Sequence, residues 1–178
     1  MHQLYLWDFQ NIADIKHSIR SLIEKDFIEF SFLYQSCFQN TKILRDISDF
    51  LCTEIGMSSK WKTRIVLIVD EMNNNAIEYG SKENDMNEFF VSIKRKSHSF
   101  DIHMFVCDAG TWEYAKSAQD MENIRKQKLS HSLDIHNSVR GRGLFMIILN
   151  LVDELYFLDW EKGGLKVGIK KELPFSED

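Results

Sequence analysis

The chain has 178 residues, of which 44% are apolar, and its formal net charge is -5. This length suits a single domain, and the apolar fraction suffices for a hydrophobic core, which excludes a disordered chain. The acidic balance argues against direct nucleic-acid binding, because proteins that neutralise many phosphates usually carry a surplus of Lys and Arg. The single proline, Pro174, lies near the C-terminal end, so no proline-rich linker divides the chain.

The cysteines and the lengths of the apolar runs indicate the cellular compartment in which the protein works. Cys37, Cys52 and Cys107 show no CxxC or other metal-ligand spacing, and we expect them to be reduced thiols. The first residues lack a basic stretch followed by an apolar one, so we expect no signal peptide. Apolar runs such as residues 65–69 are far too short to cross a bilayer. These features predict a soluble, cytoplasmic protein that does not contact a membrane.

The first half of the chain is mainly helical in its hydrophobic pattern. Apolar residues recur at three- and four-residue steps over residues 11–25, from about 40 to 56, and from 59 to 79, which predicts three helices. We expect Asn11 to cap the first helix. Between the first two helices, a run rich in aromatic and β-branched residues predicts a strand over Phe27–Tyr34.

The second half alternates strands with a long polar segment. The polar stretch 112–139 has weak periodicity, and we expect a lid that carries one short helix. The remaining elements predicted here are strands over 88–94, 100–107, 154–160 and 165–173, and a helix over 144–152. The order of elements predicts an α+β fold, a two-layer sandwich in which helices cover one face of a mostly antiparallel mixed sheet.

The end of the longest predicted helix carries the first candidate site. Glu71 and Asn75 are four residues apart, so their side chains lie on one face of that helix. Three consecutive asparagines are unfavourable in a helix, because the side chain competes for backbone hydrogen bonds. A carboxylate next to an amide can orient a water and offer a hard oxygen to Mg²⁺. A solvated helix end with incidental asparagines explains the residues about equally well.

The second candidate is Asp108-Ala109-Gly110, which directly follows an apolar strand. Asp108 can point into a pocket while Gly110 lets the backbone turn away. Such a carboxylate can accept a hydrogen bond from an exocyclic amine such as that of adenine. By itself the segment favours ordinary turn chemistry, because Asp-x-Gly is common in turns.

The third candidate is Arg140-Gly141-Arg142-Gly143-Leu144, at the start of a predicted helix. The glycines allow the backbone to approach a ligand closely, and the helix start presents N–H groups with partial positive charge. The two arginines add cations suited to phosphate. Phosphate binding is favoured over a flexible basic loop, because glycine, arginine and helix start coincide. No P-loop, GxGxxG, GxSxG or HExxH motif competes with this segment, and the six histidines show no ligand-like spacing.

Together, in this order, the three segments resemble the GHKL ATPase superfamily, and within it the anti-sigma factor serine kinases of bacterial partner-switching systems. The resemblance covers about residues 27–173. The matching motifs are residues 71–76 for the N box, 108–110 for the first glycine box and 141–147 for the second.

The resemblance implies ATP and Mg²⁺ as cofactors and assigns a role to each matching residue. It makes Glu71 the general base, Asn75 the Mg²⁺ ligand and Asp108 the residue that reads adenine. The further residues that it places around the nucleotide are Gly110, Arg140, Gly141, Arg142, Gly143 and Leu144.

It also implies a domain organisation. Residues 27–178 form the ATPase domain, and residues 1–26 precede its usual first strand as a helical extension. One departure from the family pattern is Trp112, which stands where the first glycine box has its second glycine. We expect its indole either to narrow the nucleotide pocket or to cover adenine.

The function implied is a Mg²⁺–ATP-dependent serine/threonine kinase that phosphorylates an anti-anti-sigma (STAS-type) partner and sequesters a sigma factor. The family also leads us to expect a homodimer, formed through the sheet or the first helices. The alternative is a non-catalytic anti-sigma binding module, either ATP-sensing or nucleotide-blind, and Trp112 motivates it. A two-component histidine kinase is disfavoured, because residues 1–26 are too short for a phosphoacceptor helical hairpin.

Overall fold

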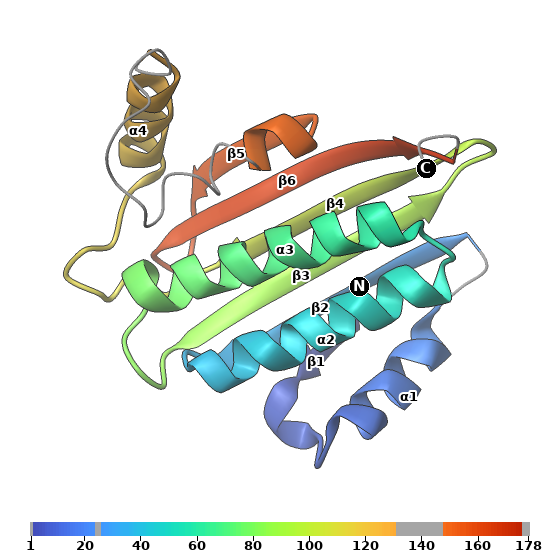
Figure 1. Ribbon diagram of the computed structural model, residues 1–178. Coiled ribbons are helices and arrows are strands. Elements are labelled where there is room, and N and C mark those ends of the chain that lie inside the picture. Colours follow the sequence, from blue (N-terminus) through green and yellow to red (C-terminus); the bar gives the residue numbers. More distant parts are fainter. Residues whose placement is uncertain (1, 24–25, 131–147, 176–178) are drawn as a thin grey trace.

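The computed structural model describes residues 2–23, 26–130 and 148–175, which build one mixed sheet with helices on one face (Figure 1). Within these ranges six strands lie in the order β1-β2-β3-β4-β6-β5. Neighbouring strands are antiparallel, except that β1 runs parallel to β2. The strands are β1 (His2–Tyr5), β2 (Phe27–Gln35), β3 (Met86–Arg95), β4 (Ser99–Cys107), β5 (Glu154–Asp159) and β6 (Leu165–Pro174). The predicted two-layer α+β architecture is confirmed.

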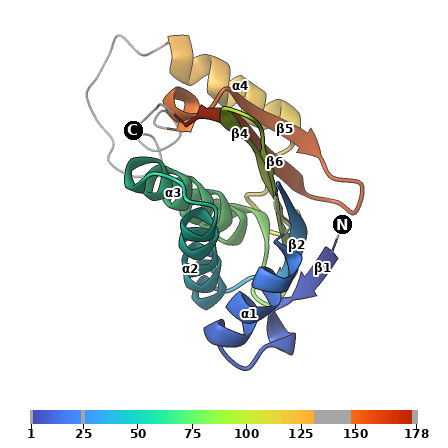
Figure 2. The ribbon, with the colours of Figure 1, turned by 90° about the vertical axis from the view of Figure 1, so that its right-hand side faces the viewer.

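Helices cover one face of this sheet. They are α1 (Ile12–Leu22), α2 (Phe38–Glu54), α3 (Ser59–Asn75) and α4 (Ala118–Ser130), with a 3₁₀ turn η1 (Leu6–Asp8) and a π-helical turn η2 (Ala76–Gly80). Figure 2, which looks along the layers, shows α2 and α3 side by side against the sheet, whose other face no described helix covers. In the described ranges no helix combines the length and the apolar character that a bilayer crossing requires.

The core lies between the sheet and α2 and α3. Alternate residues of β2, namely Phe30, Phe32 and Tyr34, are fully buried, as period-two side-chain alternation requires of a strand with one covered face. Leu44 of α2 and Ile65 of α3 are fully buried in the same cluster. This packing fixes α3 on the sheet and therefore sets where its C-terminal end lies.

Four details differ from the sequence prediction. Strand β1 was not predicted, because four residues carry too little alternation to be distinguished from a loop. Helix α2 begins at Phe38 rather than near residue 40, and the long third helix changes to π-helical geometry after Asn75. The helix expected within the polar stretch 112–139 is present as α4, but at 13 residues it is longer than the short helix predicted.

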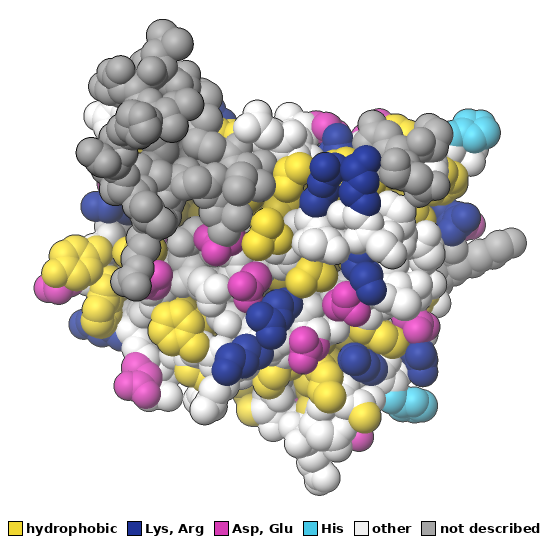
Figure 3. Space-filling view, viewed as in Figure 1, with side chains coloured by type: hydrophobic (Ala, Val, Ile, Leu, Met, Phe, Trp, Pro, Cys, Tyr) yellow, Lys and Arg dark blue, Asp and Glu magenta, His cyan; other side chains and the backbone are white. Residues whose placement is uncertain are grey.

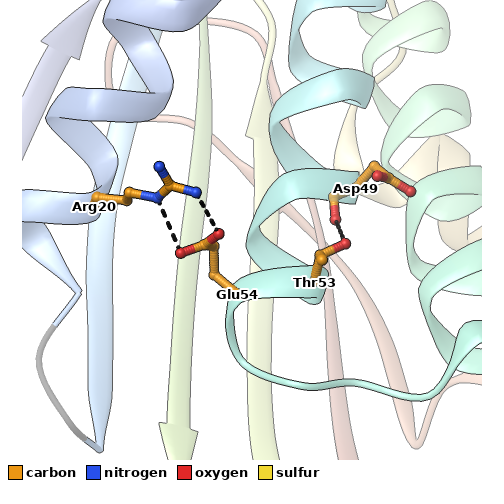
Figure 4. Close-up of polar contacts among 4 residues, drawn as sticks. All are labelled: Arg20, Asp49, Thr53 and Glu54. Carbon is orange, nitrogen blue, oxygen red and sulfur yellow. Dashed lines mark hydrogen bonds and ion pairs between the residues drawn. The ribbon is translucent and has the colours of Figure 1, made fainter.

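Residues 2–22 extend the sheet and its helical layer at one edge. Strand β1 pairs with β2 in the register His2↔Phe30, so this segment contributes a strand as well as the expected helix. The Asn11 side chain accepts hydrogen bonds from the backbone N–H groups at the start of α1, which confirms the predicted cap. Arg20 donates two hydrogen bonds to Glu54 at the end of α2, at 2.8 and 3.1 Å, beside the Thr53–Asp49 helical contact (Figure 4).

Candidate functional site

A cavity of about 510 Å³ lies between the end of α3, the sheet and α4. Its volume falls within the range of roughly 300–1,000 Å³ that is typical of small-molecule sites. The sheet contributes apolar walls, formed by Val106, Leu155, Phe157, Leu165 and Val167. The acidic residues at the cavity are Glu71 and Asp108, and the exposed amide of Asn75 joins them. The structure therefore brings the first two candidate segments of the sequence into one site.

Asp108 is held rigidly at this cavity. Its Oδ1 accepts hydrogen bonds from the backbone N–H groups of Gly110, at 2.9 Å, and Leu165, at 3.0 Å. The residue is only 6% exposed. Burial raises the pKa of the Asp108 carboxyl, and the two N–H donors offset part of that rise. Oδ1 accepts both of these backbone hydrogen bonds, and Oδ2 accepts neither of them.

Glycines surround the Asp108 carboxyl because nothing larger fits there. A Cβ at Gly80 would collide with the carboxyl group itself. A Cβ at Gly164, whose φ is +94°, would collide with the carbonyl oxygen of Asp108. Gly110, with φ of +64°, packs against the backbone of Gly164. The left-handed conformations and the close approaches both require glycine, and together they fix where the carboxyl group lies.

The α3 end places Glu71 and Asn75 on successive turns at the same cavity. Burial raises the pKa of the Glu71 carboxyl, and the neighbouring charges of Asp70 and Glu78 raise it further. A carboxylate with a raised pKa is a stronger base than an ordinary glutamate. The site thus contains one carboxylate suited to accept a proton, that of Glu71, and one held in place to accept a hydrogen bond, that of Asp108.

The three consecutive asparagines have different environments. Asn73 is fully buried: its Oδ1 accepts the Tyr34 hydroxyl at 2.6 Å and its Nδ2 donates to the carbonyl of Val69 at 2.8 Å. Burial raises the pKa of Tyr34 well above its usual range, so this hydroxyl stays a donor. Asn73 therefore links α3 to β2, whereas Asn75 is exposed at the cavity. The sequence alone did not separate these two roles.

A hydrogen-bond network that the sequence analysis missed joins the helix end to the Asp108 loop. The Ser81 hydroxyl accepts the Ala109 N–H at 2.8 Å and donates to Asn87 Oδ1 at 2.5 Å. The carbonyl of Gly80 accepts the N–H of Thr111 at 3.0 Å. These contacts make the residues after η2 and the loop after β4 one structural unit. Their separation of 28 residues leaves no local sequence signal.

The segment after Asp108 corrects one expectation. Trp112 is 37% exposed and does not belong to the described cavity lining, so its indole does not narrow the cavity, and the alternative that it covers adenine stays a prediction. Tyr114 and Lys116 line the cavity instead. The helix within the predicted lid packs on the sheet: Arg125 of α4 donates to the carbonyl of Leu155 at 3.0 Å, which fixes α4 on β5.

The third candidate segment cannot be placed. Arg140, Gly141, Arg142, Gly143 and Leu144 lie outside the described residues. Among the described residues that line the cavity, Lys116 is the only Lys or Arg.

A family comparison agrees with this geometry. The sequence model of the histidine kinase-like ATPase domain matches residues 37–171, more than half of the chain. The chain belongs to the histidine kinase-like ATPase family. The matched range runs from the start of α2 into β6 and includes Glu71, Asn75 and Asp108. No curated protein matches the chain. The family supports a GHKL-type, ATP-binding, kinase-like function.

The residues present at the cavity fit the ligands that this family binds, which are ATP and usually Mg²⁺. Apolar walls and a fixed carboxylate acceptor suit a flat heterocycle with an exocyclic amine. Asn75 offers an amide oxygen, a hard ligand of the kind that Mg²⁺ uses alongside phosphate oxygens and water.

Proposed function

We propose that this chain is a cytoplasmic, Mg²⁺–ATP-dependent serine/threonine protein kinase. Its substrate would be an anti-anti-sigma protein of the STAS type, and it would sequester a sigma factor in the alternative state. The observation that carries the kinase proposal is Glu71, a carboxylate with a raised pKa at the same cavity as the buried carboxylate of Asp108. A purely ATP-binding module has no need of a base at that position.

In this proposal the adenine ring lies between the apolar walls, with Asp108 as its polar partner. Oδ2 of Asp108 accepts the exocyclic amine, because Oδ1 is already engaged by Gly110 and Leu165. Asn75 would hold Mg²⁺ through its amide oxygen, and the bound ion would offset the negative charge that develops on the phosphates. The segment containing Arg140, Gly141, Arg142, Gly143 and Leu144 supplies cations and backbone N–H groups to the same phosphates.

Phosphoryl transfer then needs a base for the substrate hydroxyl. Glu71 takes the proton as the serine or threonine oxygen forms a bond to the γ-phosphorus. The bond from that phosphorus to the bridging oxygen breaks, and ADP leaves with the electron pair. Burial of Glu71 supports this role, because it raises the basicity of the carboxylate toward the working pH.

The direct test incubates the purified chain with Mg²⁺, γ-labelled ATP and a panel of purified STAS-domain proteins. We expect label on a serine or threonine of one panel member, and loss of that label with the Glu71→Gln variant. Binding of ATP without transfer to any panel member would contradict the kinase and favour the non-catalytic anti-sigma module. Absence of ATP binding would favour the nucleotide-blind form of that module.

We also propose a homodimer formed through the face of the sheet that no described helix covers. The rings of Phe90 and Phe105 stack there with centroids 4.5 Å apart. The Tyr156 side chain lies over Gly168, and its hydroxyl forms a hydrogen bond of 2.7 Å with Nε2 of His103. An aromatic surface of this kind on a sheet is typical of an interface. Sedimentation equilibrium of the chain and of a Phe105→Glu variant tests the proposal. We expect a dimer for the first and a monomer for the second.

A further inference from the structure

Three exposed aromatic residues lie together at the cavity, and we call them the aromatic rim: Tyr79, Trp112 and Tyr114. Their exposed fractions are 46%, 37% and 57%. Tyr79 and Tyr114 line the cavity, whereas Trp112 lies beyond its lining and meets Tyr114 edge to face, with ring centroids 6.4 Å apart. Figure 3 shows hydrophobic side chains gathered at the left edge of the molecule, where the connection after β4 runs. The rim thus extends the apolar surface outward from the nucleotide site.

The backbone beneath the rim is fixed. The N–H groups of Thr111 and Trp112 both donate to the carbonyl of Gly80, at 3.0 and 3.4 Å. The Thr111 hydroxyl contacts the Asp85 carboxylate and accepts the N–H of Lys82 at 3.1 Å. Aromatic side chains on a fixed backbone lose little conformational entropy on binding, because each has only two rotatable side-chain bonds. The rim is therefore prepared for binding without a large rearrangement.

The extent of the rim indicates the size of its ligand. A nucleotide inside the cavity can reach Tyr79 and Tyr114, but Trp112 lies outside the cavity lining. A ligand that covers all three rings must be larger than a nucleotide. Exposed Tyr and Trp side chains are the residue types most enriched at the energetic centres of protein interfaces.

The charges around the rim indicate its chemical class. The exposed charged residues near the rim in sequence include three acids, Glu78, Glu83 and Glu113, and two bases, Lys82 and Lys116. The excess of acids over bases disfavours nucleic acid and anionic lipid as ligands. The same surface can bind a polypeptide that places an apolar side chain against the aromatic rings of the rim. The ligand class is therefore a protein.

We propose that the aromatic rim is the docking surface for the protein that receives the phosphoryl group. The bound segment presents its serine or threonine hydroxyl to Glu71 and an apolar side chain to Trp112. This inference rests on the proposed kinase function, because Glu71 lines the cavity that the rim borders.

The test measures binding apart from transfer. The STAS-domain panel is titrated by calorimetry into the chain loaded with Mg²⁺ and a non-hydrolysable ATP analogue. For the panel member that binds, we expect Trp112→Ala to raise the Kd about 10- to 30-fold, as removal of an interface hot spot does. Trp112→Phe should restore most of the affinity. The matched control is Trp7→Ala, since Trp7 is 52% exposed but lies in η1, next to β1.

The outcomes separate docking from catalysis. An unchanged Kd for Trp112→Ala, or an equal loss for Trp7→Ala, would overturn the docking surface and leave a kinase activity intact. A fall in affinity for the ATP analogue itself with Trp112→Ala would also overturn it, because the indole would then belong to the nucleotide site. Rim-dependent binding without phosphorylation would overturn both the kinase and the assignment of the bound protein as its substrate, and would leave the rim as the binding surface of a non-catalytic module. If no panel member binds, both proposals fail.

Discussion

The N-terminal segment and the end of α3 are held in contrasting ways. Residues 2–22 use ordinary devices: an asparagine cap, a short parallel strand and the exposed ion pair between Arg20 and Glu54. The end of α3 meets the Asp108 loop through features that oppose stability. Carboxylates lose solvent there, and a helix changes to π geometry.

This contrast distinguishes a region that stabilises the fold, residues 2–22, from a region with the features of a functional site, the end of α3 with the Asp108 loop. A region that only has to fold can satisfy each charge at the surface at little cost. A region that binds an anionic nucleotide and moves a proton has to keep carboxylates partly desolvated. The unfavourable features of the Asp108 region are therefore the best physical evidence that it is the functional one. Substitutions in the Asp108 region should therefore change ATP binding or phosphoryl transfer, whereas substitutions in the N-terminal segment should not.

The largest expected effect comes from Glu71→Gln. We expect phosphoryl transfer to fall about 10²- to 10⁴-fold, the usual contribution of a general base, with ATP affinity unchanged. The matched control is Asp46→Asn, because Asp46 is an exposed acid of α2 that does not line the cavity. Single-turnover transfer from labelled ATP measures the rate. Equal rates for wild type and Glu71→Gln would remove Glu71 from the chemistry.

Next in size is Ser81→Ala, which leaves the Ala109 N–H and the Asn87 side chain without their hydroxyl partner. We expect a loss of about 1–3 kcal/mol in the free energy of unfolding, measured in urea, and weaker ATP binding. Ser48→Ala is the matched control: Ser48 is equally buried, but its hydroxyl bonds only to the Leu44 carbonyl within α2. If ATP affinity falls equally in both variants, Ser81 does not position the Asp108 loop.

A third prediction uses the pH dependence of stability. Because the pKa of Glu71 is raised in the folded state, its ionisation opposes folding as the pH rises through that pKa. Glu71→Gln should therefore melt at a higher temperature than wild type at pH 7. The difference should close as the pH falls toward the unfolded value of 4.5, where the carboxyl is increasingly protonated in both states. Thermal melts from pH 4 to 8 measure this, and a gap that widens on acidification would contradict it.

The smallest effect is expected in the N-terminal segment. Arg20→Met removes the ion pair with Glu54, in which the arginine side chain is 61% exposed. Exposed pairs contribute about 0–1 kcal/mol, so we expect a change in unfolding free energy within that range and no change in ATP affinity. A loss of ATP affinity in Arg20→Met would show that the N-terminal segment and the Asp108 region are energetically coupled, which would contradict the distinction between them.

Much of the fold was predictable, because it follows from local periodicity. The helical spacing of Ile65, Ile68 and Met72 predicted α3, and the run of aromatic and β-branched residues predicted β2. Strand β1 was not predictable, because it depends on pairing with Phe30 and its neighbours in β2 rather than on its own pattern.

The site was predictable only in part. Glu71 and Asn75 were found because helical spacing fixes their relation, and Asp108 because it follows a strand. The role of Ser81 was not predictable, since its partner Ala109 is brought near only by the tertiary fold. The expectation that Trp112 narrows the cavity was wrong for the same reason: its position depends on how the Gly80 carbonyl anchors that loop.

The central claim is that Asp108 reads adenine in the cavity at the end of α3. Calorimetric titration with Mg²⁺–ATP and Mg²⁺–GTP tests it most directly, because the carboxylate accepts from the exocyclic amine of adenine but repels the carbonyl at the same position of guanine. We predict saturable binding of ATP and at least tenfold weaker binding of GTP. Asp108→Asn should weaken ATP binding by about 10- to 100-fold, as expected for the loss of a buried hydrogen-bond acceptor. Equal affinity for the two nucleotides, or ATP affinity unchanged in Asp108→Asn, would contradict the account.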